Sequence, residues 1–438
     1  MTIHIIGAGL AGCEAAWQLI NRNIPVTLHE MRPLKKSAAH KTALFGELVC
    51  SNSLRANNIE NAVGLLKEEM RQLNSLIITA ADKCQVPAGG ALAVDREGFA
   101  QYITATIKNH PLINLIEEEV IDIKPSEGDY WVIASGPLTE GALADNIAHL
   151  VHKDYFHFFD AAAPIVAADS LDRDKVYLAS RYDKGEAAYL NCPFTEQEYK
   201  YFWQELCHAE VAPIKEFEQK VFFEGCMPIE EMASRGEDTM RFGPLKPVGL
   251  PIPETGEEPY AVVQLRQDNS SATMYNIVGF QTHLKWGEQK RVFGLIPGLE
   301  KAEFLRYGVM HKNSYINSPE LLKSDFSLRD NKQIYFAGQI TGVEGYVESA
   351  ASGLMVGMEI AAQVLLNRDV AFPATTALGS LANYVSDPTV KSFQPMNINF
   401  GLIPPLEKTK RMKKKEKNAM LAQRSLVALS EWQADLRI

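Results

Sequence analysis

The chain has 438 residues, with 44 Lys and Arg against 54 Asp and Glu, which gives a net charge of −10. A hydrophobic content of 46% excludes a disordered chain. The length exceeds what one small core requires, so we expect one large domain with an insertion, or two domains. The acidic balance argues against a simple basic nucleic-acid binder, although a local basic patch is compatible with it.

The spacing of the cysteines gives no zinc knuckle and no paired redox motif, so we predict no metal site. A chain of this size with few cysteines does not need a disulfide scaffold, and we expect free thiols in a reducing cytoplasm. The best apolar stretch, residues 350–366, contains Glu359 and is shorter than the roughly 20 residues that a membrane span requires. We therefore expect no membrane segment.

The chain opens with a strand–turn–helix–strand pattern. Residues 2–6 predict a buried strand, residues 13–21 a helix and residues 25–29 a second strand. Between the first strand and the helix lies a complete G-x-G-x-x-G motif, Gly7-Ala8-Gly9-Leu10-Ala11-Gly12. Its first glycine permits the tight turn, the second lets the backbone approach a pyrophosphate, and the third lets the helix pack on the strand. Glu30 ends the second strand, where a carboxylate can bind a ribose diol. The pattern predicts a dinucleotide site.

The motif alone does not separate NAD from FAD, but its position at residue 7 favours FAD. Residues 131–136 and 333–338 predict two further strands that end in small-residue turns, and residues 348–365 predict a helix after a second glycine-rich turn. The dinucleotide fold is therefore interrupted. We predict an α/β protein with a Rossmann-like FAD-binding domain and an inserted α+β domain. The boundaries that we expect are residues 1–155 and 330–438 for the first domain and 156–329 for the insertion, with the active site at the seam.

Two cysteines lie in surroundings that suit a reactive thiol. Cys50 precedes the polar run Ser51-Asn52-Ser53, which is typical of a turn or a helix cap. Cys226 lies between Gly225 and Pro228, which predict an irregular loop after an apolar strand. Both positions offer access to a ligand. Nothing in their neighbourhoods assigns a role to the other four thiols.

Three segments carry cations that could contact an anionic ligand. Residues 227–250 form a predicted loop with glycines and basic side chains, which also suits a solvated surface. Trp286 lies near Lys290, and its ring could stack on a base or a pterin or simply pack. The basic run at residues 408–417 includes Lys413, Lys414 and Lys415. Such a run is either a solvated helix face or a set of phosphate contacts.

Several of these motifs occur together in one known family. The most discriminating are Cys-Ser-Asn-Ser at 50–53 and Glu-Gly-Cys-Met-Pro at 224–228; the others are the glycine motif at 7–12, Glu-Met-Arg-Pro at 30–33, Leu-Arg-Gln-Asp-Asn at 265–269 and the glycine-rich segment 337–346. With them the chain resembles the folate- and FAD-dependent tRNA (uracil-5-)-methyltransferases nearly end to end. A sister family that modifies wobble uridines shares the flavin core but has an added C-terminal helical domain, for which we expect this chain to be too short.

The resemblance implies a reaction and a set of cofactors. A one-carbon unit passes from 5,10-methylenetetrahydrofolate to C5 of the T-loop uridine (position 54) of tRNA, and FADH2, regenerated by NADPH or NADH, supplies the reducing equivalents. The partners are tRNA and these cosubstrates, with no membrane and no stable protein partner, and the expected location is the cytoplasm.

The resemblance also implies roles for particular residues. Cys226 is the expected nucleophile, because addition of a thiolate to C6 of uracil turns C5 into an enolate carbon. Cys50 is the second active-site thiol, and the residues alone do not order the two roles. The glycine motif, Glu30 and Arg32 are expected to hold FAD, with Gly338 and the stacking candidate Tyr346 near the flavin. Trp286 and Lys290 are candidates for folate or RNA contacts, and Lys413, Lys414 and Lys415 for RNA.

Three other functions stay open at this point. A flavoprotein oxidoreductase acting on a small metabolite would share the FAD motif but would not need Cys226. A noncatalytic RNA-binding module would use the basic run alone. Methylation of a ribosomal RNA uridine would use the same chemistry, and no motif separates the two RNAs.

Overall fold

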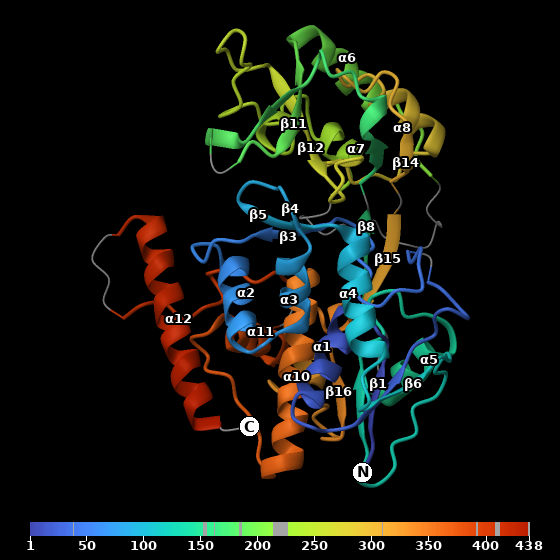
Figure 1. The fold of residues 1–438 in the computed structure, drawn as a ribbon, viewed down its shortest axis with the longest axis vertical. Helices are drawn as coiled ribbons and strands as arrows, with labels where there is room; N and C mark the ends of the chain where they lie inside the picture. The colour runs from blue at the N-terminus through green and yellow to red at the C-terminus, as the bar shows by residue number, and fades with distance from the viewer. Residues whose placement is uncertain are drawn as a thin grey trace.

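The structure, a computed structural model, describes residues 1–37, 39–151, 156–161, 163–183, 186–212, 227–308, 310–390, 393–407 and 412–436. Two large hydrophobic cores organise these residues. One core draws on residues between Ile3 and Val151 and between Tyr315 and Leu436, and the other on residues between Val166 and Ala302. Figure 1 shows the helices and strands that carry the second core above those that carry the first, so the chain is an interrupted domain that carries an inserted one.

The first domain is built on a parallel sheet of five strands. Their order is β16-β7-β1-β2-β6, and every neighbouring pair is parallel. The strands are β1 (Ile3–Ile6), β2 (Val26–His29), β6 (Ile113–Ile116), β7 (Tyr130–Ile133) and β16 (Ile334–Phe336). Because the strands are parallel, their carboxyl ends meet at one edge, and a ligand site is expected there.

Helices cover this sheet and extend the domain. They are α1 (Leu10–Ile20), α2 (Ala62–Gln72), α3 (Leu76–Lys83), α4 (Arg96–Lys108), α5 (Gly141–Val151), α9 (Ser318–Leu321), α10 (Tyr346–Leu366), α11 (Ala377–Ser386) and α12 (Lys414–Leu436). A small antiparallel sheet of β3 (Ser53–Ala56), β5 (Ala91–Val94) and β4 (Gln85–Val86) lies on the side that faces the inserted domain. The long helix α12 runs along the outside of the first domain (Figure 1).

Helices α1 and α10 pack with their backbones in close contact. A Cβ atom on Gly353 would lie 2.1 Å from the carbonyl oxygen of Ala11, and one on Gly357 would lie 2.7 Å from that of Ala15. Glycine at both positions therefore lets α10 approach α1. By length and composition alone α10 could cross a membrane, which the sequence did not lead us to expect. In this fold most of it is buried, and it packs against α1, α2 and α11.

The inserted domain contains an antiparallel sheet of six strands with helices packed on it. The strand order is β10-β11-β12-β13-β9-β14. The elements are β9 (Ile165–Ala167), β10 (Tyr177–Ala179), β11 (Tyr189–Phe194), α6 (Glu196–Cys207), α7 (Ile229–Ser234), β12 (Ala261–Gln267), β13 (Met274–Ile277), α8 (Trp286–Phe293) and β14 (Phe304–Arg306). An antiparallel ribbon of β8 (Phe156–Ala161) and β15 (Met310–Tyr315) runs between the two domains.

The predicted fold class is confirmed. The strands expected in the first domain are β1, β2, β7 and β16, and the helices expected after the two glycine-rich turns are α1 and α10. The expected loop at residues 227–250 is wrong in part, because it contains α7 and a short 3-10 turn at Met240–Phe242. The exact domain boundaries stay a prediction; the segment 315–328 contributes Tyr315, Ile316 and Leu328 to the first core.

Candidate active site

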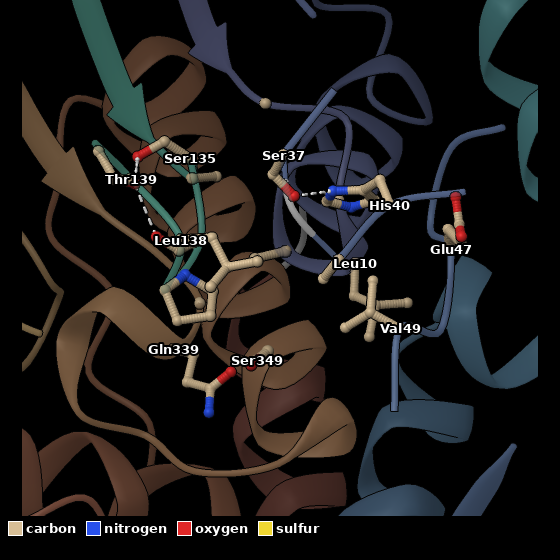
Figure 2. Close-up of a pocket in the computed structure, with 18 of the residues that line it drawn as sticks. Leu10, Ser37, His40, Glu47, Val49, Ser135, Leu138, Thr139, Gln339 and Ser349 are labelled. Atoms are coloured by element: carbon tan, nitrogen blue, oxygen red, sulfur yellow. Dashed lines mark hydrogen bonds between the residues drawn. The ribbon is translucent and has the colours of Figure 1, made fainter. Parts of the chain in front are cut away.

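A cavity of about 460 Å³ lies at the carboxyl ends of the parallel strands and reaches the seam between the domains. Figure 2 shows Ser135, Leu138 and Thr139, which follow β7, on one side of it and Leu10 and Val49 on the other. Of the predicted site residues, the following line the cavity: Gly7, Gly9, Leu10, Ala11, Glu30, Arg32, Cys50, Gly338 and Tyr346. The inserted domain contributes Arg266 and Gln281 to the same lining.

The three glycines of the first turn each meet a different steric requirement. Gly7 has a φ of +99°, and a Cβ atom there would lie 2.6 Å from the carbonyl oxygen of Ala134. A Cβ atom on Gly12 would lie 1.8 Å from the carbonyl oxygen of Gly7, so the turn and the start of α1 pack with no room for a side chain. A Cβ atom on Gly9 would meet nothing within 4 Å. The backbone at Gly9 is therefore open to the cavity, as a bound pyrophosphate requires.

Glu30 and Arg32 form a buried pair that braces this turn. The Glu30 carboxylate accepts the Ala8 N–H at 2.7 Å and two side-chain N–H groups of Arg32 at 2.8 and 2.9 Å. Burial alone would raise the pKa of Glu30, but the hydrogen bonds from Arg32 hold it below its ordinary value. Arg32 also donates to the Leu44 carbonyl oxygen at 2.6 Å. An ionised Glu30 thus joins the glycine turn to Arg32, and its expected contact with a ribose stays a prediction.

Tyr346 and Cys50 meet at the other end of the cavity. The Tyr346 hydroxyl accepts the backbone N–H of Cys50 at 2.7 Å and that of Ser51 at 3.2 Å. Tyr346 begins α10, directly after Gly345, whose φ is +107°. Gly338, with a φ of +85°, precedes the same glycine-rich segment and donates its N–H to Ser352 Oγ at 2.7 Å. Residues about 300 positions apart are therefore brought together beside one thiol.

Cys226, the expected nucleophile, lies outside the described residues. The described chain resumes at Met227, which is buried. The Ile229 N–H donates to the carbonyl oxygen of Gln281 at 2.7 Å, and Gln281 lines the cavity. The chain that follows Cys226 is thus fixed beside the cavity.

The surface residues predicted to bind RNA or folate are not part of the cavity lining. The Trp286 side chain is 62% exposed, and its ring stacks on Tyr307 with 5.4 Å between centroids. Lys290 is exposed on the same helix, α8. Lys413, Lys414 and Lys415 are exposed at the start of α12.

The structure also shows site residues to which the sequence assigned no role. Three arginines, Arg96, Arg266 and Arg306, contact the loop that carries Cys50. Arg266 belongs to the 265–269 motif quoted above, and this motif was the one sequence signal that pointed to any of the three arginines.

A separate cluster of Asp325, Glu359 and Asp369 has carboxylate oxygens within 4.8 Å of one another. All three accept protein hydrogen bonds, so we assign no metal to them.

The parallel sheet, the glycine turn and the seam cavity define a Rossmann-like dinucleotide-binding protein with an inserted domain. The family model described as "Glucose inhibited division protein A" (GIDA) matches residues 2–368. The fold is similar to that of GidA from Aquifex aeolicus in its form II crystal, with a TM-score of 0.72, 14% sequence identity and coverage of 99% of this chain and 73% of that one. A second crystal form of the same protein gives a TM-score of 0.69 at 14% identity, with coverage of 98% and 76%.

Sequence relatives are more specific. The chain is 61% identical over 430 residues to the methylenetetrahydrofolate--tRNA-(uracil-5-)-methyltransferase TrmFO of Listeria monocytogenes serovar 1/2a, covering 98% of both chains. It is 60% identical to the protein of the same name from Bacillus subtilis strain 168, covering 97% of both. The chain belongs to the TrmFO family within the GIDA proteins, so the resemblance inferred from the motifs is confirmed.

Proposed function

We propose that the chain is a folate- and FAD-dependent tRNA uracil-5-methyltransferase. It takes a one-carbon unit from 5,10-methylenetetrahydrofolate and places it on C5 of the T-loop uridine of tRNA, with NADPH or NADH as the reductant. The observation that carries the proposal is the full-length identity of about 60% to relatives named for this reaction. The seam cavity supports it, because a dinucleotide turn and a thiol line the same space.

The residues of the cavity fit FAD. The open backbone at Gly9 and the start of α1 suit a pyrophosphate, and the Glu30–Arg32 pair lies at the end of β2, where an adenosine ribose is expected. Gly338 and Tyr346 would hold the flavin end. When bound, reduced FAD supplies the reducing equivalents that turn a methylene unit into a methyl group. The chain's own task is to orient the reactants and to exclude water.

Two thiols are proposed to act at this site. Cys226 is the proposed nucleophile for C6 of uracil. The proposal is supported by its position in the chain directly before Met227, because the Ile229 N–H that follows binds the carbonyl oxygen of Gln281 in the cavity lining. Cys50 is the proposed second thiol, supported by its place in the cavity lining beside Tyr346. The five cysteines among the described residues are all free, which fits a reducing cytoplasm.

Two of the proposed RNA contacts, Lys414 and Lys415, are cations that do not stabilise the helix on which they lie. Lysines in the first turn of a helix oppose its macrodipole, so Lys414 and Lys415 weaken the start of α12 rather than stabilise it. Lys415 lies 3.3 Å from Glu60, whose loop follows the cavity-lining strand β3. The start of α12 is thereby fixed to the loop that leads out of the cavity. Trp286 and Lys290 are proposed as further contacts on the inserted domain.

Nucleoside mass spectrometry tests the substrate. Unmodified tRNA and a ribosomal RNA fragment are incubated separately with the FAD-bound protein, methylenetetrahydrofolate and NADPH. We expect 5-methyluridine in the tRNA alone. The same product only in the ribosomal fragment would overturn the tRNA assignment but not the chemistry. No product in either RNA, together with NADPH turnover on small acceptors, would instead favour a metabolite oxidoreductase.

The nucleophile is tested by Cys226→Ala. We expect this variant to keep FAD and to lose methyl transfer by more than ~10³-fold, since removal of a nucleophile leaves only binding and orientation. Cys207→Ala, which removes an exposed thiol of the inserted domain, is the matched control and should keep wild-type activity. Full activity in Cys226→Ala would exclude it as the nucleophile.

A further inference from the structure

The loop of residues 48–52, which carries Cys50, is held by three arginines. Arg96 is the first residue of α4 in the first domain. Arg266 on β12 and Arg306 at the end of β14 belong to the inserted domain. The guanidinium groups therefore reach the same loop from both sides of the seam. We call Arg96, Arg266 and Arg306 the arginine clamp.

Arg96 holds the loop from the side of the first domain. It donates to the carbonyl oxygen of Leu48 and, at 3.3 Å from Nη2, to that of Cys50. Its other partner is Asp268, whose carboxylate accepts from Nη2 at 2.9 Å and from Nε at 3.2 Å. Asp268 is only 1% exposed, so this bidentate pair is strong and orients the guanidinium.

The other two arginines come from the inserted domain. Arg306 donates to the carbonyl oxygen of Val49. Arg266 donates to Ser51 Oγ at 2.6 Å and to Asn52 Oδ1 at 3.0 Å. Each loop residue from 48 to 52 thus accepts a hydrogen bond from the arginine clamp.

The charges around the thiol do not balance. Among the described side chains that hydrogen-bond to this loop or to the arginine clamp, three guanidinium groups face one carboxylate, that of Asp268. Tyr346 adds a hydroxyl, which accepts two backbone N–H groups of the loop. The Nε–H of Arg306 is buried and has no acceptor among the described residues, so a donor is left over. A negative charge beside this loop would compensate the excess positive charge of the arginine clamp and could accept a hydrogen bond from the Nε–H of Arg306.

The pKa values of Arg306 and Arg96 show that Cys50 lies within the field of these two arginines. Burial lowers the pKa of Arg306 and the neighbouring Arg96 lowers it further, whereas a negative charge on Cys50 raises it. Burial also lowers the pKa of Arg96, but neighbouring negative charges raise it above its ordinary value. The largest of these contributions comes from Asp268, and Cys50 makes a smaller one. Because such interactions are mutual, arginines that are stabilised by a thiolate also stabilise that thiolate.

We propose that the arginine clamp keeps Cys50 as a thiolate and fixes its position, so that Arg96, Arg266 and Arg306 are positioning residues for this thiol. The inference rests on the place of Cys50 in the active site under the proposed function. Two of the three cations come from the inserted domain, so the reactive form of Cys50 depends on the seam being assembled. The thiol is thereby ionised only where the cavity is complete.

The first test uses the unmodified FAD-bound protein. The rate at which iodoacetamide alkylates each cysteine is measured by peptide mass spectrometry across a range of pH. Burial raises the pKa of Cys84 and Cys207, so these partly exposed thiols are internal references. We expect the ionisation midpoint of Cys50 to lie at least about one pH unit below that of Cys207, as for a thiol beside cations. A midpoint at or above that of Cys207 would overturn the proposal.

A pair of variants then separates charge from fold. Arg306→Lys keeps the cation and should leave the midpoint of Cys50 nearly unchanged. Arg306→Gln keeps an N–H donor but loses the charge, and it should raise the midpoint by about one pH unit. Arg173→Gln, on an exposed arginine of the same domain, is the control and should have no effect. Equal midpoints in Arg306→Lys and Arg306→Gln would also contradict the proposal.

Two safeguards keep the result interpretable. If bound FAD shields Cys50 from iodoacetamide, the midpoint is measured instead from the ultraviolet absorbance of the thiolate. The absorbance of the Cys50→Ser variant is subtracted from that of wild type at each pH. The readout needs no RNA or folate. A protein that fails to methylate tRNA but has an ionised Cys50 would refute the proposed function alone, and an active protein with a neutral Cys50 would refute this inference alone.

Discussion

At the scale of single residues, the site is specified by side chains that each connect two distant segments. The Tyr346 hydroxyl is the example with the clearest consequence, because it accepts hydrogen bonds from Cys50 and Ser51, almost 300 residues away. Tyr346 lines the cavity in which the flavin is proposed to bind, while its hydroxyl anchors the thiol loop. One side chain therefore has two separable parts.

Tyr346→Phe separates them. The ring is kept, so we expect FAD to bind within about twofold of wild type. The hydroxyl is lost, and two N–H groups of the loop are left without their acceptor, at a cost on the order of 1–3 kcal/mol. Methyl transfer should fall about tenfold while flavin content, measured by absorbance, is maintained. Tyr346→Ala should lose both. A Phe variant with full activity would show that the hydroxyl does not anchor the loop.

Sequence reasoning reached some of these residues and missed others for a physical reason. Cys50 and the glycines stand in local motifs whose chemistry is readable along the chain. Arg96 pairs with Asp268 across 172 positions, and Arg306 contacts Val49 across 257. Nothing in the local pattern of an arginine indicates which carbonyl oxygen it will meet, so the arginine clamp became visible only in the fold.

At the scale of secondary-structure elements, the position of the glycine turn depends on how α1 and α10 pack. The strands and helices nearest the cofactor motifs were predictable, because short runs of strand-favouring residues mark the strands and glycine-rich or small-residue turns follow several of them. The α1–α10 contact was not, since Gly353 and Gly357 look like weak points in an otherwise good helix. In the structure these two glycines are the positions at which α10 contacts the backbone of α1.

Gly353→Ala tests this packing. A Cβ atom there would lie 2.1 Å from Ala11 O, so the two backbones must separate. We expect a loss of about 1–3 kcal/mol in the free energy of unfolding, measured with urea, and weaker FAD retention because α1 carries the phosphate turn. Gly90→Ala is the control, since its Cβ would meet nothing within 4 Å. Equal stability of the two variants would contradict the account of the helix contact.

Glu69 on α2 connects two other elements and makes their attachment sensitive to pH. It accepts the N–H groups of Ala377 and Leu378 at the start of α11, at 2.8 and 2.9 Å, and the hydroxyl of Ser425 on α12. Burial raises the pKa of Glu69 to about 7, against an ordinary value of 4.5, although these hydrogen bonds oppose the shift. Between these two pH values the folded state binds more protons than the unfolded state, so the contribution of Glu69 to stability falls as pH rises.

Glu69→Gln, which cannot ionise, should remove this loss. We expect the melting temperature of wild type, relative to the variant, to fall between about pH 4.5 and pH 7, by an amount that corresponds to a few kcal/mol in the free energy of unfolding. Glu97→Gln, at an exposed carboxylate on α4, should leave the pH profile as in wild type. Parallel profiles for wild type and Glu69→Gln would show that Glu69 does not titrate in this range.

At the scale of the whole molecule, the two domains meet at the cavity and α12 lies outside the first one. The chain has a net charge of −10 and as a whole repels RNA. Exposed lysines are therefore expected to bind RNA phosphates only where several of them lie close together. Lys413, Lys414 and Lys415 gather at the end of α12 that lies beside the loop of Glu60. The division into an interrupted domain and an insertion followed from where the cofactor motifs stand in the chain, but the relative placement of the domains did not.

Replacing Lys413, Lys414 and Lys415 by Gln should weaken tRNA binding. If each contacts one phosphate, the slope of log K against log salt should decrease in magnitude by about 2–3. A charge-matched triple variant at the exposed Lys108, Lys124 and Lys332 is the control, and its slope should stay as in wild type. Fluorescence anisotropy with labelled tRNA measures both. An unchanged slope in the first variant would mean that these lysines form only a solvated helix face.

In the proposed reaction the methyl carbon comes from the folate. The most direct measurement gives the FAD-bound protein unmodified tRNA and NADPH, with ¹³C in the methylene group of methylenetetrahydrofolate and unlabelled S-adenosylmethionine present. A parallel reaction exchanges the label between the two donors. We expect 5-methyluridine to carry ¹³C only when the folate is labelled, and no product to form without folate. Label arriving from S-adenosylmethionine, or product formed in the absence of folate, would contradict this expectation.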